Sequence, residues 1–129
     1  MGNTFSKAER LCSQRRIENL FSAGSKSVSS YPIRAVYQAV DDEQSFPVQV
    51  LISVSKRHFK HAVDRNRMKR LIREAYRQHK QLLWQALEPT DARLSLAFIY
   101  QSDELSDYST VESHIINLLQ RVADNFHVS

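Results

Sequence analysis

The apolar residues of the chain follow two periods, and the changes between these periods mark six predicted elements. Apolar side chains recur at every second position over 32–40 and 48–55, which is typical of half-buried strands. A continuous apolar run at 94–100 predicts a third, more deeply buried strand. Spacings of three and four positions predict helices over Ser13–Ala23, through Met68–Tyr76 and over Val111–Val122.

The predicted middle helix has an apolar face and a basic face. At about 100° per residue, one side collects Met68, Leu71, Ile72, Ala75 and Tyr76. The opposite side collects Asn66, Lys69, Arg70, Arg73, Arg77 and Lys80. Leu82 and Leu83 continue the apolar face after a bend near 78–80. We therefore expect this helix to be both a core element and a basic surface.

Capping and breaking residues set the ends of these elements. Ser13 is predicted to cap the first helix and Gly24 to end it. The spacing of Ser109 and Glu112 forms a capping box, which predicts the start of the last helix. Polar segments predicted as loops, turns or breaks lie at 25–30, 41–45 and 88–93.

The order of the elements predicts an α+β fold. Strands separated by helices in a chain of 129 residues indicate an α/β sandwich, with about three helices on a small mixed sheet. We expect a hairpin between the first two strands and an opposite sheet face that is only partly covered. With 42% hydrophobic residues, residues 1–129 are predicted to form a single domain.

Composition excludes several classes of site and location. One cysteine, Cys12, excludes an internal disulfide and a cysteine-based zinc cluster, and two glycines exclude a glycine-rich phosphate loop. No run of 18 apolar residues and no apolar signal segment is present, so no membrane partner is expected. The predicted location is the cytoplasm.

Basic charge is concentrated in one fifth of the chain. Residues 56–80 contain ten basic and two acidic side chains, whereas the other 104 residues carry a net charge of −4. Arginine outnumbers lysine by 12 to 6, and its planar guanidinium group suits phosphate oxygens. The concentration indicates a polyanionic partner, and composition alone leaves DNA and RNA both open.

Residues that could perform chemistry are few. Asp41, Asp42 and Glu43 could hold a metal ion, but adjacent acids in a polar turn are more often solvated. His58 and His61 could act as acid and base, but no partner in register supports them. We therefore predict no catalytic residue and no metal ligand on the protein.

One segment is more specific than its charge. Ser53–Lys56 reads SVSK, and Ala62–Ala75 carries the run RNR at 65–67 followed by KRLIRE. This order resembles the protein subunit of bacterial ribonuclease P, in which a strand, a short basic loop and the RNR helix follow one another. Residues 11–24 are similar to the first helix of that family. The resemblance covers about residues 6–125 and is strongest over 48–77.

The resemblance implies a fold and a function. The family has an α/β sandwich with a left-handed βαβ crossover around the RNR helix, opposite to the usual hand. Its members bind a catalytic RNA and the 5′ leader of precursor tRNA, and the holoenzyme is an endoribonuclease that removes the leader. The RNA performs the hydrolysis with Mg²⁺, which it mainly holds, so the protein alone is not expected to be catalytic. No obligate protein partner is evident.

The resemblance also implies two groups of site residues. Those expected to bind the catalytic RNA are Lys56, Arg57, Arg65, Asn66, Arg67, Lys69, Arg70 and Arg73. Those expected to line a leader-binding cleft between the first helix and the sheet are Ile17, Phe21, Val36 and Tyr37. Phe21 matches an aromatic residue of that cleft, whereas Ile17 replaces a second aromatic. Val36 or Tyr37 is expected to be the strand residue of the cleft.

Two other classes of protein share some of these features. A ribosomal or other RNA-binding scaffold would have the basic helix but would need no leader cleft. A nuclease that acts without RNA would need clustered acids for metal ions, which the sequence lacks. The RNR run favours the ribozyme subunit over both.

Overall fold

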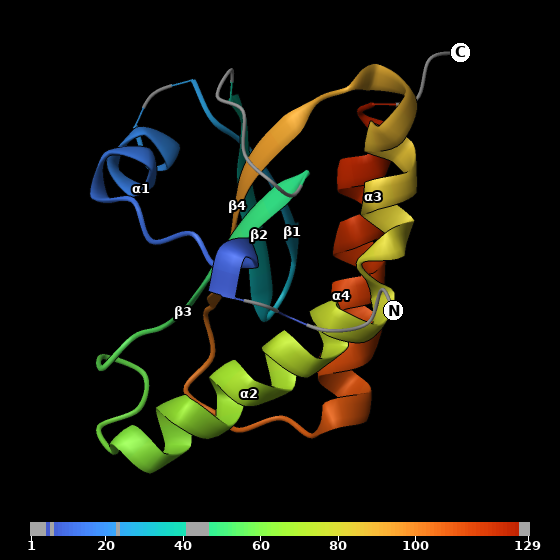
Figure 1. The fold of residues 1–129 in the computed structure, drawn as a ribbon. Helices are drawn as coiled ribbons and strands as arrows, with labels where there is room; N and C mark the ends of the chain where they lie inside the picture. The colour runs from blue at the N-terminus through green and yellow to red at the C-terminus, as the bar shows by residue number, and fades with distance from the viewer. Residues whose placement is uncertain (1–4, 6, 23, 41–46, 127–129) are drawn as a thin grey trace.

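The chain forms a four-stranded sheet with helices on both faces, in a computed structural model that describes residues 5, 7–22, 24–40 and 47–126 (Figure 1). The elements are, in order, η1 (Lys7–Glu9), α1 (Gln14–Leu20), β1 (Lys26–Ser30), β2 (Ile33–Val40), β3 (Val48–Val54), α2 (Ala62–His79), α3 (Gln81–Leu87), η2 (Glu88–Thr90), β4 (Arg93–Tyr100) and α4 (Tyr108–Asp124). The predicted α+β class is confirmed. No helix of the described residues is long and apolar enough to cross a bilayer.

The sheet is mixed and has the strand order β1-β2-β4-β3. β2 is antiparallel to β1 and to β4, and β3 is parallel to β4. The parallel pair is joined through α2 and α3, which is the βαβ connection that the resemblance implies. The left hand of this crossover stays a prediction from the resemblance.

One face of the sheet holds the main core. α2, α3 and α4 lie on this face, and α1 lies on the other (Figure 1). Met68, Ile72 and Tyr76 of α2 are fully buried against β4 residues such as Phe98, because their helical spacing puts them on one side. The apolar face predicted for this helix is confirmed at these positions. The helix bends at Lys80, where α2 gives way to α3, as predicted.

The opposite face has a smaller apolar cluster. Leu11, Leu20, Val36 and Ala97 are buried there, with Ile17, Leu51 and Ile99 packed against them at partial exposure. Alternate residues of a strand point to opposite faces, so each strand supplies side chains to both clusters. The expectation of one well-covered and one partly covered face is confirmed.

Two predictions about the sheet are wrong. Residues 25–30, predicted as a loop, contain the edge strand β1, whose serine-rich sequence has no apolar period. The predicted hairpin between 32–40 and 48–55 does not form, because β2 pairs with β1 on one edge and with β4 on the other. β3 instead takes the far edge of β4.

The helix ends agree with the predictions in part. Ser13 caps α1 by accepting a hydrogen bond from the amide of Arg16, but the helix ends at Leu20 rather than at residue 23. Gly24 has a φ of +105°, a conformation that suits glycine. The predicted capping box at Ser109 is wrong: Asp107 caps α4 by accepting from the amide of Thr110, which lowers the pKa of Asp107. Ala23 and the predicted turn at 41–45 lie outside the described residues.

The N-terminal segment is fastened to the junction of α2 and α3. Lys80 Nζ lies 2.7 Å from Glu9 Oε1, and both side chains are at least 98% buried. Lys80 also lies over the ring of Trp84, 4.6 Å from its centroid. The amide of Leu11 donates to the carbonyl of Val50, which continues this attachment along β3. The segment therefore covers part of the core and leads into α1.

Candidate nucleic-acid interface

The N-terminal half of α2 and the loop before it carry basic side chains that form no ion pair with another described residue. Arg67 and Arg70 are exposed on α2, as are Lys56 and Arg57 in the loop, whereas Lys69 and Arg73 are half-buried. None of these six side chains forms a hydrogen bond or ion pair with another described residue. Asn66 is exposed among them. We call these six residues, together with Asn66, the basic surface.

The geometry of α2 explains why the basic surface is continuous. Asn66, Arg70 and Arg73 are spaced by four and three positions, so their side chains follow one stripe of the helix. The buried positions Met68, Ile72 and Ala75 fix the opposite side against the sheet. The stripe therefore faces away from the core and can track a row of phosphate oxygens.

Arg65 differs from the other members of the predicted RNA-binding group. Its Nη1 donates to the carbonyl of Phe59 at 2.8 Å and to that of Lys60 at 2.9 Å. Phe59 is buried and stacks near Tyr100, with ring centroids 6.0 Å apart. The structure thus gives Arg65 a role in holding the basic loop against the helix. Its predicted contact with the catalytic RNA stays a prediction.

Two further basic residues of the segment are bonded to acids. Arg77 binds both carboxylate oxygens of Glu74, and this bonding lowers the pKa of Glu74 to about 2. Lys80 is buried with Glu9. Arg77 and Lys80 were both predicted to lie on the basic face, and for Lys80 this is wrong because its charge lies inside the protein. The basic surface is therefore shorter than the basic run of the sequence.

A side-chain contact between two loops holds the basic loop in place. His58 Nδ1 lies 2.6 Å from Asp103 Oδ1, which joins the loop before α2 to the loop after β4. The Asp103 side chain is largely exposed, so this pair lies at the surface of the protein. His61, at the N-cap position of α2, forms no side-chain cap. His58 therefore has a carboxylate partner that the sequence did not indicate, whereas His61 is exposed.

The opposite face of the sheet has a polar pocket beside α1. Its volume is about 350 Å³, and it is lined by Arg15, Arg16, Asn19, Ser22, Gln38, Ala39 and Val40. Arg16 Nη1 donates to Gln49 Oε1 at 2.6 Å, which ties α1 to β3. A cationic wall from the helix and a strand backbone opposite form a pocket that suits a single strand of nucleic acid.

The predicted cleft residues are divided between two faces. Ile17 and Val36 lie together in the small cluster under α1, and both are mainly packing residues there. Phe21, at the end of α1, is 49% exposed, so its ring is available to a ligand. Each of these three belongs to α1 or to the sheet face that α1 covers.

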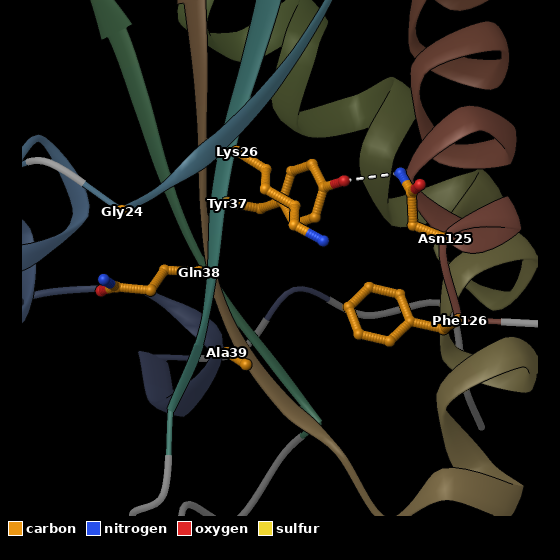
Figure 2. A pocket seen from close by; sticks show the side chains of 7 residues that line it. All are labelled: Gly24, Lys26, Tyr37, Gln38, Ala39, Asn125 and Phe126. Atoms are coloured by element: carbon orange, nitrogen blue, oxygen red, sulfur yellow. Dashed lines mark hydrogen bonds between the residues drawn. The ribbon is translucent and has the colours of Figure 1, made fainter.

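Tyr37 does not belong to that face, and its predicted place in the cleft is wrong. It pairs with Leu96 of the main core, is 3% exposed and accepts a hydrogen bond from Asn125 Nδ2 at 2.6 Å. Burial raises its pKa. Figure 2 shows Tyr37 and Phe126 on the α4 side of β2, whereas Gln38 points the other way. Of the two alternatives for the strand residue, the structure places Val36 under α1.

The charged lining of the α1 pocket was not predicted from the sequence. Arg15, Arg16 and Asn19 come from one short helix, and only the run of two arginines at 15–16 could have indicated it. Among the described residues, no group of three or more His, Cys, Asp or Glu side chains could hold a metal ion. The acids at 41–43, considered above as metal ligands, lie outside the described residues.

Comparison with known sequences finds one family. A family model described as Ribonuclease P matches residues 5–123. The ribonuclease P protein component of Porphyromonas gingivalis (strain ATCC 33277) is 42% identical over 120 residues, which cover 93% of this chain and 87% of that protein. The ribonuclease P protein component of Chlorobaculum tepidum is 32% identical over 132 residues, which cover 95% of this chain and 85% of that protein.

Comparison with solved structures finds the same fold. The RNase P protein of Staphylococcus aureus superposes with a TM-score of 0.71 at 20% identity, covering 94% of this chain and 100% of that one. The RNase P protein of Thermotoga maritima gives 0.69 at 23% identity, covering 88% and 96%. At these identities the likeness concerns the fold alone.

Proposed function

Because the chain belongs to the ribonuclease P family of protein components, we propose that it binds the catalytic RNA through its basic surface and the 5′ leader of precursor tRNA beside α1. The family membership makes it a subunit of an endoribonuclease that processes tRNA. Its two RNA sites lie on different parts of the fold. We place the holoenzyme in the cytoplasm.

The observation that carries this proposal is the set of basic side chains around the RNR run that form no ion pair with another described residue. Six such side chains lie on the side of α2 away from the core and in the loop before it. Arginine forks bind phosphate oxygens with charge-assisted hydrogen bonds, and release of counterions from the RNA adds to the affinity. A-form RNA is recognised mainly by such phosphate contacts and by its shape.

The leader site is supported by the pocket beside α1. Arg15 and Arg16 can attract the backbone of a single strand, and the half-exposed ring of Phe21 can stack on a base. α1 lies on the other face of the sheet from α2 (Figure 1), so leader and catalytic RNA do not compete for the same side chains. Val36 and Ile17 form the apolar support beneath this helix.

We assign the hydrolysis to the RNA, with Mg²⁺ held mainly by the RNA. Bound to the RNA, such an ion would supply Lewis-acid chemistry for the hydrolysis of the phosphodiester. The part of this chain described by the structure has no acid cluster for such an ion. Its own contribution is to orient two RNA strands and to neutralise phosphates, which lowers the concentration of Mg²⁺ that the holoenzyme needs.

Precursor tRNA cleavage at low Mg²⁺ tests this proposal. The ribonuclease P RNA of the source organism is assayed with and without this protein, and cleavage is mapped at the mature 5′ end. We expect cleavage at low Mg²⁺ only when the protein is present. If the RNA is active at high Mg²⁺ and gains nothing from the protein, the proposal fails and an RNA-binding scaffold becomes the better interpretation.

The leader site has its own test. Phe21→Ala should weaken the binding of precursor tRNA to the holoenzyme about tenfold, because one base loses its stacking partner. Mature tRNA, which has no leader, should bind both forms of the holoenzyme equally. Leu82→Ala, an exposed apolar residue of α3, is the matched control and should change neither affinity. An equal loss for precursor and mature tRNA would argue against a leader contact at Phe21.

A further inference from the structure

The turn between β1 and β2 presents an exposed aromatic ring. Tyr31 is 68% exposed, more than any other aromatic side chain of the described residues. Its ring makes no hydrogen bond or aromatic contact with another described residue. Burial of a tyrosine ring is favourable, and tyrosine is enriched at binding interfaces, where its ring packs and its hydroxyl group stays solvated.

The turn that carries Tyr31 is held on both sides. The carbonyl of Ser29 accepts a hydrogen bond from Arg121, and Ser30 Oγ lies 2.7 Å from His114 Nδ1, both on α4. The carbonyl of Pro32 accepts from the amide of Gln101, just after β4, at 2.7 Å. The residues before and after Tyr31 are therefore fixed. A partner would lose little entropy in ordering this turn.

The same turn lies beside the basic loop. In the sheet register, Ile33 pairs with Tyr100, which pairs with Val54, so Tyr31 and Lys56 leave the same end of the sheet. Two strand spacings separate β2 from β3, or about 10 Å. Gln101 binds the turn, and two residues later Asp103 binds His58 of the basic loop. One bonded surface thus runs from Tyr31 through residues 101–103 to the basic loop.

We propose that Tyr31 is a stacking platform for an unpaired base of the catalytic RNA, at the margin of the basic surface. This inference rests on the proposed function, and it adds an apolar, uncharged contact to an interface otherwise made of cations. An RNA that follows phosphate contacts along the basic loop reaches the turn within about two nucleotide lengths of backbone, and its unpaired bases stack on aromatic rings. The nearby bonded loops fix the distance between the two kinds of contact.

The test is the affinity of the protein for the catalytic RNA over a series of salt concentrations. Tyr31→Ala should weaken binding about tenfold, because one stacked base is lost. The salt dependence should not change, because no charge is removed. Tyr31→Phe keeps the ring and should bind like the unmodified protein. Leu105→Ala, another exposed apolar residue in the loop after β4, is the control and should have no effect.

Three results would overturn the proposal. The first is wild-type affinity in folded Tyr31→Ala. The second is an equal loss in Tyr31→Phe, which would assign the effect to the hydroxyl group. The third is a loss seen only with precursor tRNA added, which would assign the ring to that RNA. Failure of the proposed function has a different signature: the unmodified protein does not bind the catalytic RNA, or Arg67→Ala leaves the affinity unchanged.

Discussion

In the N-terminal half of α2, Arg67 and Arg70 end in solvent, whereas at its C-terminal end Arg77 and Lys80 are bonded to acids of the same chain. The residue types are alike, but the surroundings differ. The start of α2 extends beyond the sheet, and its end lies beside α3 and α4 (Figure 1). Basic charge at the covered end is therefore paired within the protein, and basic charge at the open end is left for the proposed contact with RNA.

The strongest test of this difference is Lys80→Ala. It leaves the carboxylate of Glu9 buried without the cation that lies 2.7 Å away. Removing one partner of a buried ion pair costs about 3–5 kcal/mol of unfolding free energy. We expect a loss of that size in urea unfolding, with the affinity of the remaining folded protein for the catalytic RNA unchanged.

A double substitution separates the missing charge from lost packing. Replacing both partners by apolar residues, in Lys80→Met with Glu9→Leu, should recover most of the stability, because no charge then stays buried. A double variant as unstable as Lys80→Ala would show that the cost comes from packing around Trp84 rather than from the loss of the cation beside the buried carboxylate.

Arg65→Ala should produce an intermediate effect of both kinds. The two carbonyls at 59 and 60 lose their charged donor, which costs about 1–3 kcal/mol of unfolding free energy. RNA affinity also falls, because the basic loop loses its attachment to α2. Full stability in Arg65→Ala would contradict the loop-holding role.

Arg67→Ala should weaken RNA binding with a smaller salt slope, yet change the unfolding free energy by less than about 0.5 kcal/mol.

Glu74→Gln should have the smallest effect and the opposite sign for RNA. It releases Arg77 from its carboxylate, so the basic stripe gains one cation and RNA affinity rises a few-fold at low salt. The variant and the unmodified protein are compared by filter binding at the same ionic strength. An unchanged affinity would mean that Arg77 lies outside the RNA interface.

The same pair predicts a pH dependence. The pKa of Glu74 falls from its ordinary value of 4.5 to about 2, so its stabilising contribution is complete above pH 4.5 and is lost between there and pH 2. The Glu74 side chain is 40% exposed, so solvent screening keeps this contribution below about 1 kcal/mol. Urea unfolding at pH 3 and pH 6 should show a smaller pH effect in Glu74→Gln.

Regular strands and helices were predictable from the sequence because their buried positions are apolar and recur with a fixed period. β2, β3 and β4 begin and end within one residue of the predicted runs. β1 was not predictable, because Val28 is its only apolar residue and packs at partial exposure. Its pairing follows from the need of the β2 edge for backbone partners, a requirement that leaves no local signal.

The candidate site was predictable in part for the same reason. The resemblance located the RNR helix, but the chain could not show locally which cations are neutralised. Lys80 is bonded to Glu9, which lies 71 positions away. Val36 and Tyr37 are neighbours in β2, and the way this strand sits in the sheet decides which of them faces α1. Long-range contacts of this kind are a property of the folded chain and not of any segment.

The most direct test of the account is the salt dependence of catalytic-RNA binding by two variants. Arg67→Ala with Arg70→Ala removes two cations of the basic surface, and Arg77→Ala removes one that is already bonded to Glu74. We predict that the double variant lowers the slope of log affinity against log salt by about 2, because each phosphate contact contributes about 1, and that Arg77→Ala leaves the slope nearly unchanged. A change in Arg77→Ala as large per residue as in the double variant would contradict the division of α2 into an RNA-binding half and a structural end.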